Sequence, residues 1–211
     1  MLKWISPSCE FHPEISEDEL IRKIEFAYRV CYNTTHKMQH ESKEDALRFV
    51  MDKIGLGHGS PLEHVSFTFI FITSRSIANE IVRHRLASYS QESMRYCKYE
   101  NELHCILPSV CMPGGDMEHE SETFKQGVEQ SYNLYCKLRK DNMAPQFARD
   151  VLPLCTATKI VCTWNFREIL HILDLRYFSQ GAHPDLRQLM DLMYKELQVH
   201  YPNVFHRPRV F

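Results

Sequence analysis

The chain has 211 residues, of which 44% are hydrophobic, and its formal net charge at pH 7 is −2. This length and apolar content suffice for one substantial core, so we expect a single domain over residues 1–211. A general nucleic-acid binder would carry a basic excess. No apolar run approaches the ~18 residues of a membrane span, and the N-terminal residues do not resemble a signal peptide. We therefore expect a cytoplasmic protein without nucleic-acid or membrane partners.

The first half of the chain alternates between helical and strand patterns. Ser16 begins S-E-D-E, a capping box, and predicts a helix to about Tyr32. Ser42 begins a second helix that the glycines at 55 and 57 end. Residues 64–73 alternate as a strand with Phe67, Phe69 and Phe71 on one face, which we interpret as sheet core. A helix is predicted over about residues 75–85.

The second half is mostly helical. A long helix is predicted over 116–142, and Pro145 can open a short helix that carries Arg149. Residues 156–164 form a second strand pattern. Asn165 then begins N-F-R-E, which predicts a helix with Asn165 as N-cap, running through Arg176. Pro184 opens a last helix with an apolar stripe. The sum is an α+β domain with a small, mostly antiparallel sheet and several long helices.

Eight cysteines raise the question of disulfides or zinc. No pair has the spacing C-x-x-C, so the usual structural zinc pattern is missing. In a cytosolic chain of this length most cysteines act as small apolar side chains. His36 and His40 are spaced as i and i+4, but no H-E-x-x-H motif accompanies them. We therefore expect no metal site.

The segment richest in chemistry is RHRLASYSQESMRY, residues 83–96, which holds three Arg, one His, three Ser and one Gln. A guanidinium offers a planar fork of donors that fits phosphate oxygens, and serines can complete such a cradle. On the predicted helix, Arg83 and Arg85 would lie near the C-terminal end, where cations suit the helix dipole. The alternative is a solvated basic helix end without a ligand.

This segment resembles the signature of flavin-dependent thymidylate synthases, RHR-x-x-S-x-N-E-x-S-x-R-Y. Ser90 replaces the Asn of that pattern and Gln91 replaces its Glu. Three further segments resemble the family in the same order along the chain, namely GHGSPLEH at 57–64, ARDVLP at 148–153, and the run from Trp164 to Arg176. The family likeness implies the fold of these enzymes and their reaction, the methylation of dUMP to dTMP.

The resemblance also implies site residues. Those that would contact FAD are Ser60, Arg83, His84, Arg85, Gln91, Asn165, Arg167 and His171. Those that would bind dUMP are Glu80, Arg83, Gln91, Ser93, Arg95, Arg149 and Arg176. Surface ion pairing is the alternative for Arg149. His58 would lie on the side of folate and nicotinamide, with a structural histidine as the alternative reading.

Arg176 has the catalytic role in this interpretation. In the family, this arginine faces the uracil ring and stabilises the anion that forms when N3 loses its proton, which makes C5 more nucleophilic. The cycle uses methylene-tetrahydrofolate as carbon donor and NADPH or NADH as reductant, through FAD. No cysteine acts as nucleophile, because the P-C-H setting of the unrelated cysteine-dependent enzymes is missing.

The family resemblance further implies a homotetramer with active sites shared between chains. Two alternatives remain open at this stage: a nucleotide-binding or RNA-binding module that uses the Arg/Ser loop without catalysis, and a metal-dependent hydrolase built on the twelve histidines.

Overall fold

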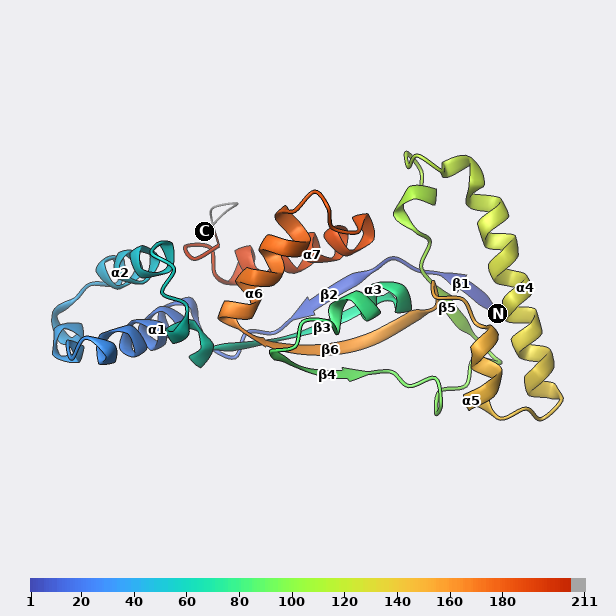
Figure 1. The fold of residues 1–211 in the computed structure, drawn as a ribbon, viewed down its shortest axis with the longest axis horizontal. Helices are drawn as coiled ribbons and strands as arrows, with labels where there is room; N and C mark the ends of the chain where they lie inside the picture. Colours follow the sequence, from blue (N-terminus) through green and yellow to red (C-terminus); the bar gives the residue numbers. More distant parts are fainter. Residues whose placement is uncertain (206–211) are drawn as a thin grey trace. The chain divides into compact units, whose positions relative to one another are not determined.

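The computed structural model describes residues 1–205, and its contacts divide the chain into two compact units. The first unit comprises residues 1–8, 71–83 and 89–161, and the second comprises residues 9–70, 84–88 and 162 onward. The units interleave along the chain because four strands each contribute residues to both. Figure 1 labels the elements that follow. The expectation of a single domain stays a prediction.

Two sheets organise the strands. One has four strands in the order β2-β3-β6-β4, with bounds Ser8–Phe11, Ser66–Ser74, Ala157–Asn165 and Ala87–Gln91. The other pairs β1 (Leu2–Trp4) with β5 (Leu103–Cys105) in parallel. The sequence patterns at 64–73 and 156–164 are thus confirmed as β3 and β6. Strands β1, β2 and β5, at three or four residues each, are too short for a period of two to stand out.

The second unit packs its helices around an aromatic core. Its helices are α1 (Glu17–Cys31), α2 (Lys43–Gly55), α6 (Phe166–Ile172) and α7 (Pro184–His200), with short 3₁₀ turns at Thr35–His40 and Ser60–His64. The capping box at Ser16 is confirmed, because the Ser16 side chain accepts from the backbone of Glu19 and the Glu19 carboxylate accepts from the backbone of Ser16. Phe67 and Phe69 are buried in the core, as predicted for their face of the strand.

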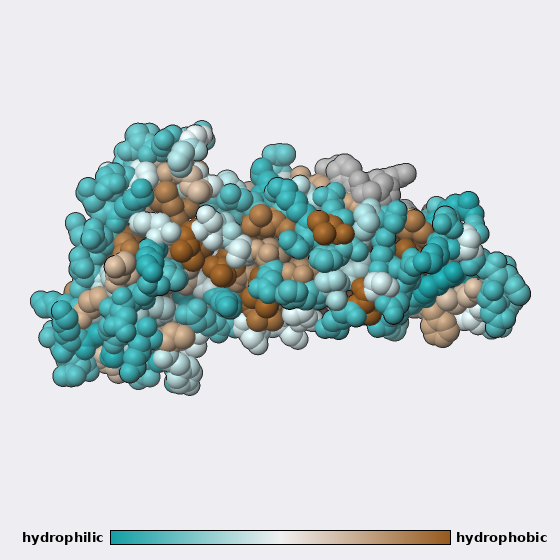
Figure 2. Space-filling view, turned by 180° about the vertical axis from the view of Figure 1, so that it is seen from behind, coloured by the Kyte–Doolittle hydropathy of each residue, from teal (hydrophilic) through white to brown (hydrophobic). Residues whose placement is uncertain are grey.

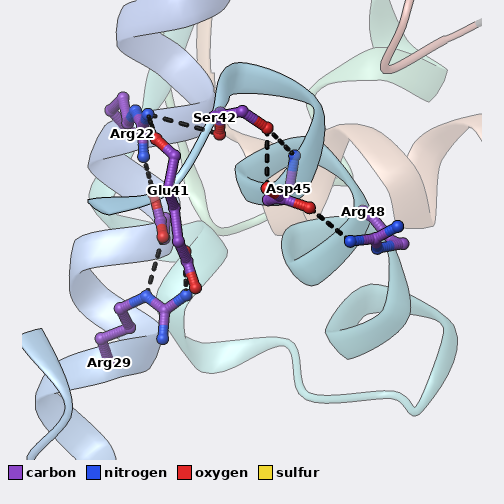
Figure 3. Close-up of polar contacts among 7 residues, drawn as sticks. Arg22, Arg29, Glu41, Ser42, Asp45 and Arg48 are labelled. Atoms are coloured by element: carbon purple, nitrogen blue, oxygen red, sulfur yellow. Dashed lines mark hydrogen bonds and ion pairs between the residues drawn. The ribbon is translucent and has the colours of Figure 1, made fainter. Parts of the chain in front are cut away.

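Helices α1 and α2 lie side by side (Figure 1), joined by an ion network that Figure 3 draws. Glu25, fully buried, accepts from Arg22 at 2.8 Å and from Arg29 at 2.7 Å. Arg29 also bonds Glu41, and its guanidinium lies 4.2 Å from the ring centre of Phe49. We call Arg22, Glu25, Arg29 and Glu41 the α1 ion cluster. Two positive and two negative charges balance within it.

The first unit carries α3 (Arg75–Ile81), α4 (Ser121–Lys140) and α5 (Pro145–Ala148), with 3₁₀ turns at Ser109–Cys111, Glu118–Glu120 and Arg149–Val151. Its core is tyrosine-rich: Tyr132 donates to the carbonyl of Tyr99 at 3.0 Å, and Tyr135 accepts from the Tyr99 backbone at 3.3 Å. Figure 2 shows hydrophobic side chains gathered in the part of this unit that carries α4. A cavity of about 690 Å³ opens there, lined mainly by apolar side chains of residues 108–128 and 153–155.

Three local expectations were wrong. The helix expected over 75–85 ends at Ile81 with Val82 as C-cap, so Arg83 and Arg85 lie beyond it and do not face its dipole. Residues 87–91, expected as loop, form strand β4, whose end is held where the Glu92 backbone donates to the carbonyl of Lys159 at 2.9 Å. Arg149 likewise follows the short helix α5 and lies on the 3₁₀ turn after it.

The cysteines and the helix lengths bear on two further expectations. All eight cysteines are free, four of them are buried, and only Cys31 is exposed. This supports the interpretation that most are packing residues. Among residues 1–205, none of the helices combines the length and apolar character that crossing a bilayer requires.

Candidate active site around His84, Glu168 and Arg176

Helix α6 and its continuation carry several residues of the candidate site. Asn165 caps it, with its side-chain oxygen accepting from the Glu168 backbone at 2.8 Å, as the motif N-F-R-E predicts. The helix continues beyond Ile172 as a π-helical segment, Leu173–Phe178, which carries Arg176. The prediction that this helix runs through Arg176 is confirmed, with a change of helical type. Single π turns of this kind are frequent at functional sites.

His84 joins the two ends of this helix. Its Nδ1 lies 3.0 Å from Oε1 of Glu168, and Arg176 Nε donates to its Nε2 at 3.3 Å. A guanidinium can only donate, so Nε2 must be the unprotonated acceptor and Nδ1 carries the proton that Glu168 accepts. We call His84, Glu168 and Arg176 the His84 cluster. All three belong to the second unit.

The environment keeps the imidazole neutral. His84 is 7% exposed and Glu168 is 8% exposed. Burial is the largest influence and lowers the pKa of His84, because it disfavours the charged ring. The Glu168 carboxylate opposes this effect, whereas Arg176 and His171 add to the lowering of the pKa. The ring is therefore an uncharged connector between a carboxylate and a guanidinium.

His171 lies next to the cluster, one helical turn beyond Glu168. Its ring centre is 6.2 Å from that of His84. Ligand atoms of His84, Glu168 and His171 all lie within 4.8 Å of one another, which is the grouping within residues 1–205 that could hold a metal ion. A cation there would displace the proton on His84 Nδ1 while the Arg176 guanidinium remains at the opposite ring nitrogen, so charge repulsion opposes it. We interpret the group as a hydrogen-bonded cluster, and the expectation of no metal site stays a prediction.

A cavity of about 240 Å³ opens in the same unit. Apolar side chains of Ile54, Leu62 and Leu170 line it together with polar ones, which are His58, Arg167, His171 and Asp174. The structure thus brings together three of the residues that the resemblance assigns to flavin or folate. Asp174 is a lining residue that the sequence reasoning missed, and only its place two residues before Arg176 could have suggested it.

The segment GHGSPLEH forms one wall of this cavity. Arg167 donates to Glu63 at 2.6 Å, and a Cβ built on Gly59 would meet Arg167 Nε at 3.0 Å. Tyr28 donates to the carbonyl of His58, which fixes the backbone from the side of α1. Ser60, an expected flavin contact, is exposed at the start of the following 3₁₀ turn. The backbone at residue 59 comes so close to the Arg167 side chain that glycine fits there best.

The RHR tripeptide alternates in exposure. His84 is buried, whereas Arg83 and Arg85 are exposed. The Arg83 side chain is 70% exposed and lies 3.6 Å from Glu80, which the resemblance places in the nucleotide site. Both arginines thus remain accessible to an anionic ligand.

The remaining predicted site residues belong to the first unit. Gln91 donates to Thr158 at 3.2 Å, and the Ser93 hydroxyl accepts from the Arg95 backbone at 3.3 Å. Arg95 is exposed, with its guanidinium 5.6 Å from the ring centre of Tyr96. Arg149 is 3.8 Å from the adjacent Asp150, a surface pair.

Comparison with known proteins identifies the family. The model of a family described as "Thymidylate synthase complementing protein" matches residues 16–203. A flavin-dependent thymidylate synthase of Geobacter sulfurreducens is 34% identical over 188 residues, covering 86% of this chain and 79% of the relative. One of Clostridium tetani is 32% identical over 200 residues, covering 85% of this chain and 78% of the relative. The chain belongs to the family of flavin-dependent thymidylate synthases.

A solved structure shows the same fold. The UMP/dUMP methylase PolB from Streptomyces cacaoi, crystallised with 5-Br dUMP, superposes with a TM-score of 0.80 over 97% of this chain and 95% of its own, at 21% identity. The α+β fold inferred from the sequence is thereby confirmed. With the family assignment, the chain is a flavin-dependent enzyme of the methyltransferase class.

Proposed function

We propose that this chain catalyses the reductive methylation of dUMP to dTMP, with methylene-tetrahydrofolate as carbon donor and NADPH or NADH as reductant through FAD. The observation that carries the proposal is the position of Arg176, on a π-helical turn and bonded to a buried neutral histidine. This is the arginine that the family resemblance assigns to the uracil ring.

Arg176 suits that role on electrostatic grounds. A guanidinium carries five N–H donors, of which the one on Nε bonds His84. Donors held beside N3 and O4 of uracil stabilise the anion formed when N3 loses its proton, and this charge raises the nucleophilicity of C5. A fixed donor does this better than a mobile one, because it needs no reorganisation during the reaction.

The chemistry of the cavity fits a flavin ring system. Flat heteroaromatic rings bind in clefts with apolar walls and a few well-placed polar groups. Ile54, Leu62 and Leu170 provide the walls, and Arg167 and His171 provide donors for ring carbonyls and nitrogens. Hydride and one-carbon transfer are the chemistry that a bound flavin supplies. His58, on the same cavity, is placed to contact folate or nicotinamide.

Residues of the first unit bind the nucleotide phosphate in this proposal. Arg95 and Arg149 both have accessible guanidinium groups, and such groups bind phosphate bidentately. Ser93, whose hydroxyl already orders the turn at Arg95, adds a donor. Glu80, Arg83 and Gln91 complete the proposed nucleotide contacts.

The cysteines support a mechanism without a thiol nucleophile. Burial raises the pKa of the Cys162 thiol to about 12 and raises the pKa of Cys9 as well. Cys105 donates to Cys155, so the pKa of Cys105 is raised and that of Cys155 lowered within one buried pair. A reactive thiol needs an exposed, electropositive setting. Each single Cys→Ser variant that folds should therefore keep measurable activity.

We extend the proposal to a homotetramer in which neighbouring chains share each active site, as the family resemblance implies. Isologous assembly gives equivalent clefts between copies of one chain. The variants Arg95→Ala and Arg176→Ala should each be inactive and should rescue each other when co-expressed, because some clefts then receive both wild-type residues. Mixed tetramers, verified by native mass spectrometry, without recovered dTMP formation would contradict shared sites.

The function itself is tested by tritium release from [5-³H]dUMP in the presence of FAD, methylene-tetrahydrofolate and NADPH. Release that needs all three components, with dTMP formed in equal amount, is the expected result. A mere nucleotide or RNA binder would be colourless and release no tritium, whereas the proposed enzyme shows flavin absorbance. A metal-dependent hydrolase would lose its activity in a chelator, and the proposed enzyme would not.

A further inference from the structure

Glu168 is a buried carboxylate to which the family resemblance assigns no role. It occupies position N3 of helix α6, where a Glu side chain in a capping box would turn back to the N-cap backbone. Here the cap bond runs from the Glu168 backbone to Asn165, while the carboxylate bonds His84 at 3.0 Å. A buried carboxylate is costly unless it serves a specific partner. The partner it serves is the ring that holds Arg176.

We infer that Glu168 is a positioning residue, which fixes the tautomer of His84 and thereby the direction in which Arg176 presents its guanidinium to the pyrimidine. This inference rests on the proposed function, since it assigns the origin of the geometry of the proposed catalytic arginine. It is carried by two consecutive hydrogen bonds, Glu168 to His84 at 3.0 Å and His84 to Arg176 at 3.3 Å.

The chain of bonds has a defined polarity. A carboxylate only accepts, so it selects the His84 tautomer with hydrogen on Nδ1. That tautomer presents a lone pair on Nε2, which accepts from Arg176 Nε. Without the carboxylate, the ring is free to carry its hydrogen on Nε2, and two N–H groups would then point at each other across the same gap. The guanidinium would turn away, and its remaining donors would leave the line of uracil N3 and O4.

A purely structural role for Glu168 makes a different prediction. The bond that caps α6 involves the backbone of Glu168 and the side chain of Asn165, so it survives replacement of the Glu168 side chain. Glu168→Met keeps the volume but removes the acceptor. Glu168→Gln keeps an acceptor oxygen that can accept from His84 Nδ1–H as the carboxylate does. The two variants are therefore matched, and they differ mainly in the ability to accept.

The kinetic test is a double-mutant cycle with Arg176. Glu168→Met should lower kcat by about ten- to a hundredfold, the usual effect of losing an orienting partner, with the KM for dUMP changed much less. Glu168→Gln should restore kcat to within about threefold of the wild type. In an Arg176→Ala background, Glu168→Met should change the residual kcat by less than about twofold, because its effect passes through Arg176. Losses that multiply in the double variant would overturn the positioning role.

A second measurement reads the tautomer without turnover. Nitrogen-15 NMR of histidine-labelled holoenzyme, with the His84 signals assigned by their loss in His84→Gln, should show the Nδ1–H form in the wild type and in Glu168→Gln. Glu168→Met should show a mixture of tautomers. An unchanged tautomer in Glu168→Met would contradict the inference even if activity fell. Wild-type enzyme that forms no dTMP would instead overturn the proposed function, so the two failures are distinguishable.

Discussion

Two polar clusters in the same unit, each built on a buried carboxylate, have different architectures. The α1 ion cluster is closed: each arginine bonds a carboxylate, and its two positive charges meet two negative ones (Figure 3). The His84 cluster is a line rather than a ring, with a neutral histidine between one carboxylate and one guanidinium. The closed cluster ties α1 to the segment that leads into α2, whereas the second cluster links Glu168 and Arg176 of one helix through the ring of His84. Burial alone does not separate the two cases, but the pattern of bonds does.

The largest effect is expected on stability, when a carboxylate is removed from the α1 ion cluster. Glu25→Ala leaves Arg29, which is 4% exposed, without its main partner. Removing one member of a buried ion pair costs about 3–5 kcal/mol of unfolding free energy. Urea unfolding should show this loss, while kcat per folded, flavin-loaded molecule stays within about twofold of the wild type. A large fall in kcat at unchanged stability would mean that the α1 ion cluster serves catalysis and not the stability of the fold.

The same variant should change the response to acid. Burial works to raise the pKa of Glu25, but hydrogen bonds from Arg29 and Arg22 and the charge of Arg22 outweigh it, so the net pKa is lowered. A carboxyl with a lowered pKa in the folded state stabilises the fold above its unfolded pKa of about 4.3 and loses that contribution as pH falls further. The stability difference between wild type and Glu25→Ala should therefore shrink below about pH 4. A constant difference from pH 7 to pH 3 would exclude this linkage.

Removing Arg176, the guanidinium of the His84 cluster, should lower the reaction rate rather than the stability of the fold. Arg176→Ala should retain bound FAD and a melting temperature close to that of the wild type, because the π-helical segment loses little packing. Loss of a charge-stabilising donor lowers the rate by about 10²–10³-fold. Steady-state tritium release measures this effect, with Arg187→Ala as a matched control on a neighbouring helix. A kcat near that of the wild type would remove Arg176 from the proposed mechanism.

An intermediate effect is expected at the ion pair between Arg167 and Glu63. Both side chains are largely exposed, which predicts little contribution to stability, yet Arg167 lines the cavity. Gly59→Ala places a Cβ 3.0 Å from Arg167 Nε and should displace that side chain. FAD affinity, measured by fluorescence, should fall about tenfold, equivalent to about 1.4 kcal/mol. Unchanged affinity would show that Arg167 does not contact the flavin.

The smallest effect is expected at the exposed ion pair between Arg48 and Asp45, which Figure 3 also draws. Arg48 pairs with Asp45 on the exposed face of α2, with Arg48 73% exposed. Solvent and salt screen such a pair. Arg48→Ala should leave melting temperature, FAD binding and kcat unchanged within error, and thus serves as the control for Glu25→Ala. A clear loss of stability would mean that exposure is a poor guide in this unit.

Local signals in the sequence predicted much of the fold. The caps at Ser16, Ser42 and Asn165 were correct because each is a local hydrogen bond between residues three apart. Strand β4 was missed because its exposure alternates only weakly and its pairing partner, β6, lies far along the chain. Helix α3 was predicted too long because the pattern of Arg83 and Arg85 fits a helix as well as the turn and the irregular chain in which they lie.

The sequence named several members of the candidate site but not the hydrogen bonds between them. His84 and Arg176 were assigned to flavin and nucleotide separately, because a bond between residues 92 positions apart leaves no mark in one sequence. Glu168 was interpreted only as a helix N3 residue. Its burial depends on packing of α6 against the segment at 84, and this packing is a property of the fold rather than of the motif. Asp174 was missed for the same reason.

Because of the π-helical turn at Leu173–Phe178, the number of residues between Asn165 and Arg176 sets both how far along the helix Arg176 lies and the direction in which its side chain points. Each residue of an α-helix advances the side chain by about 100° around the axis. The wider turn, which contains Arg176, slows this rotation, and the guanidinium of Arg176 donates to His84. Deleting one residue from the turn would restore ordinary helical winding and shift Arg176 relative to the ring of His84. In the proposed mechanism, the length of this helical segment therefore matters alongside the identity of the arginine.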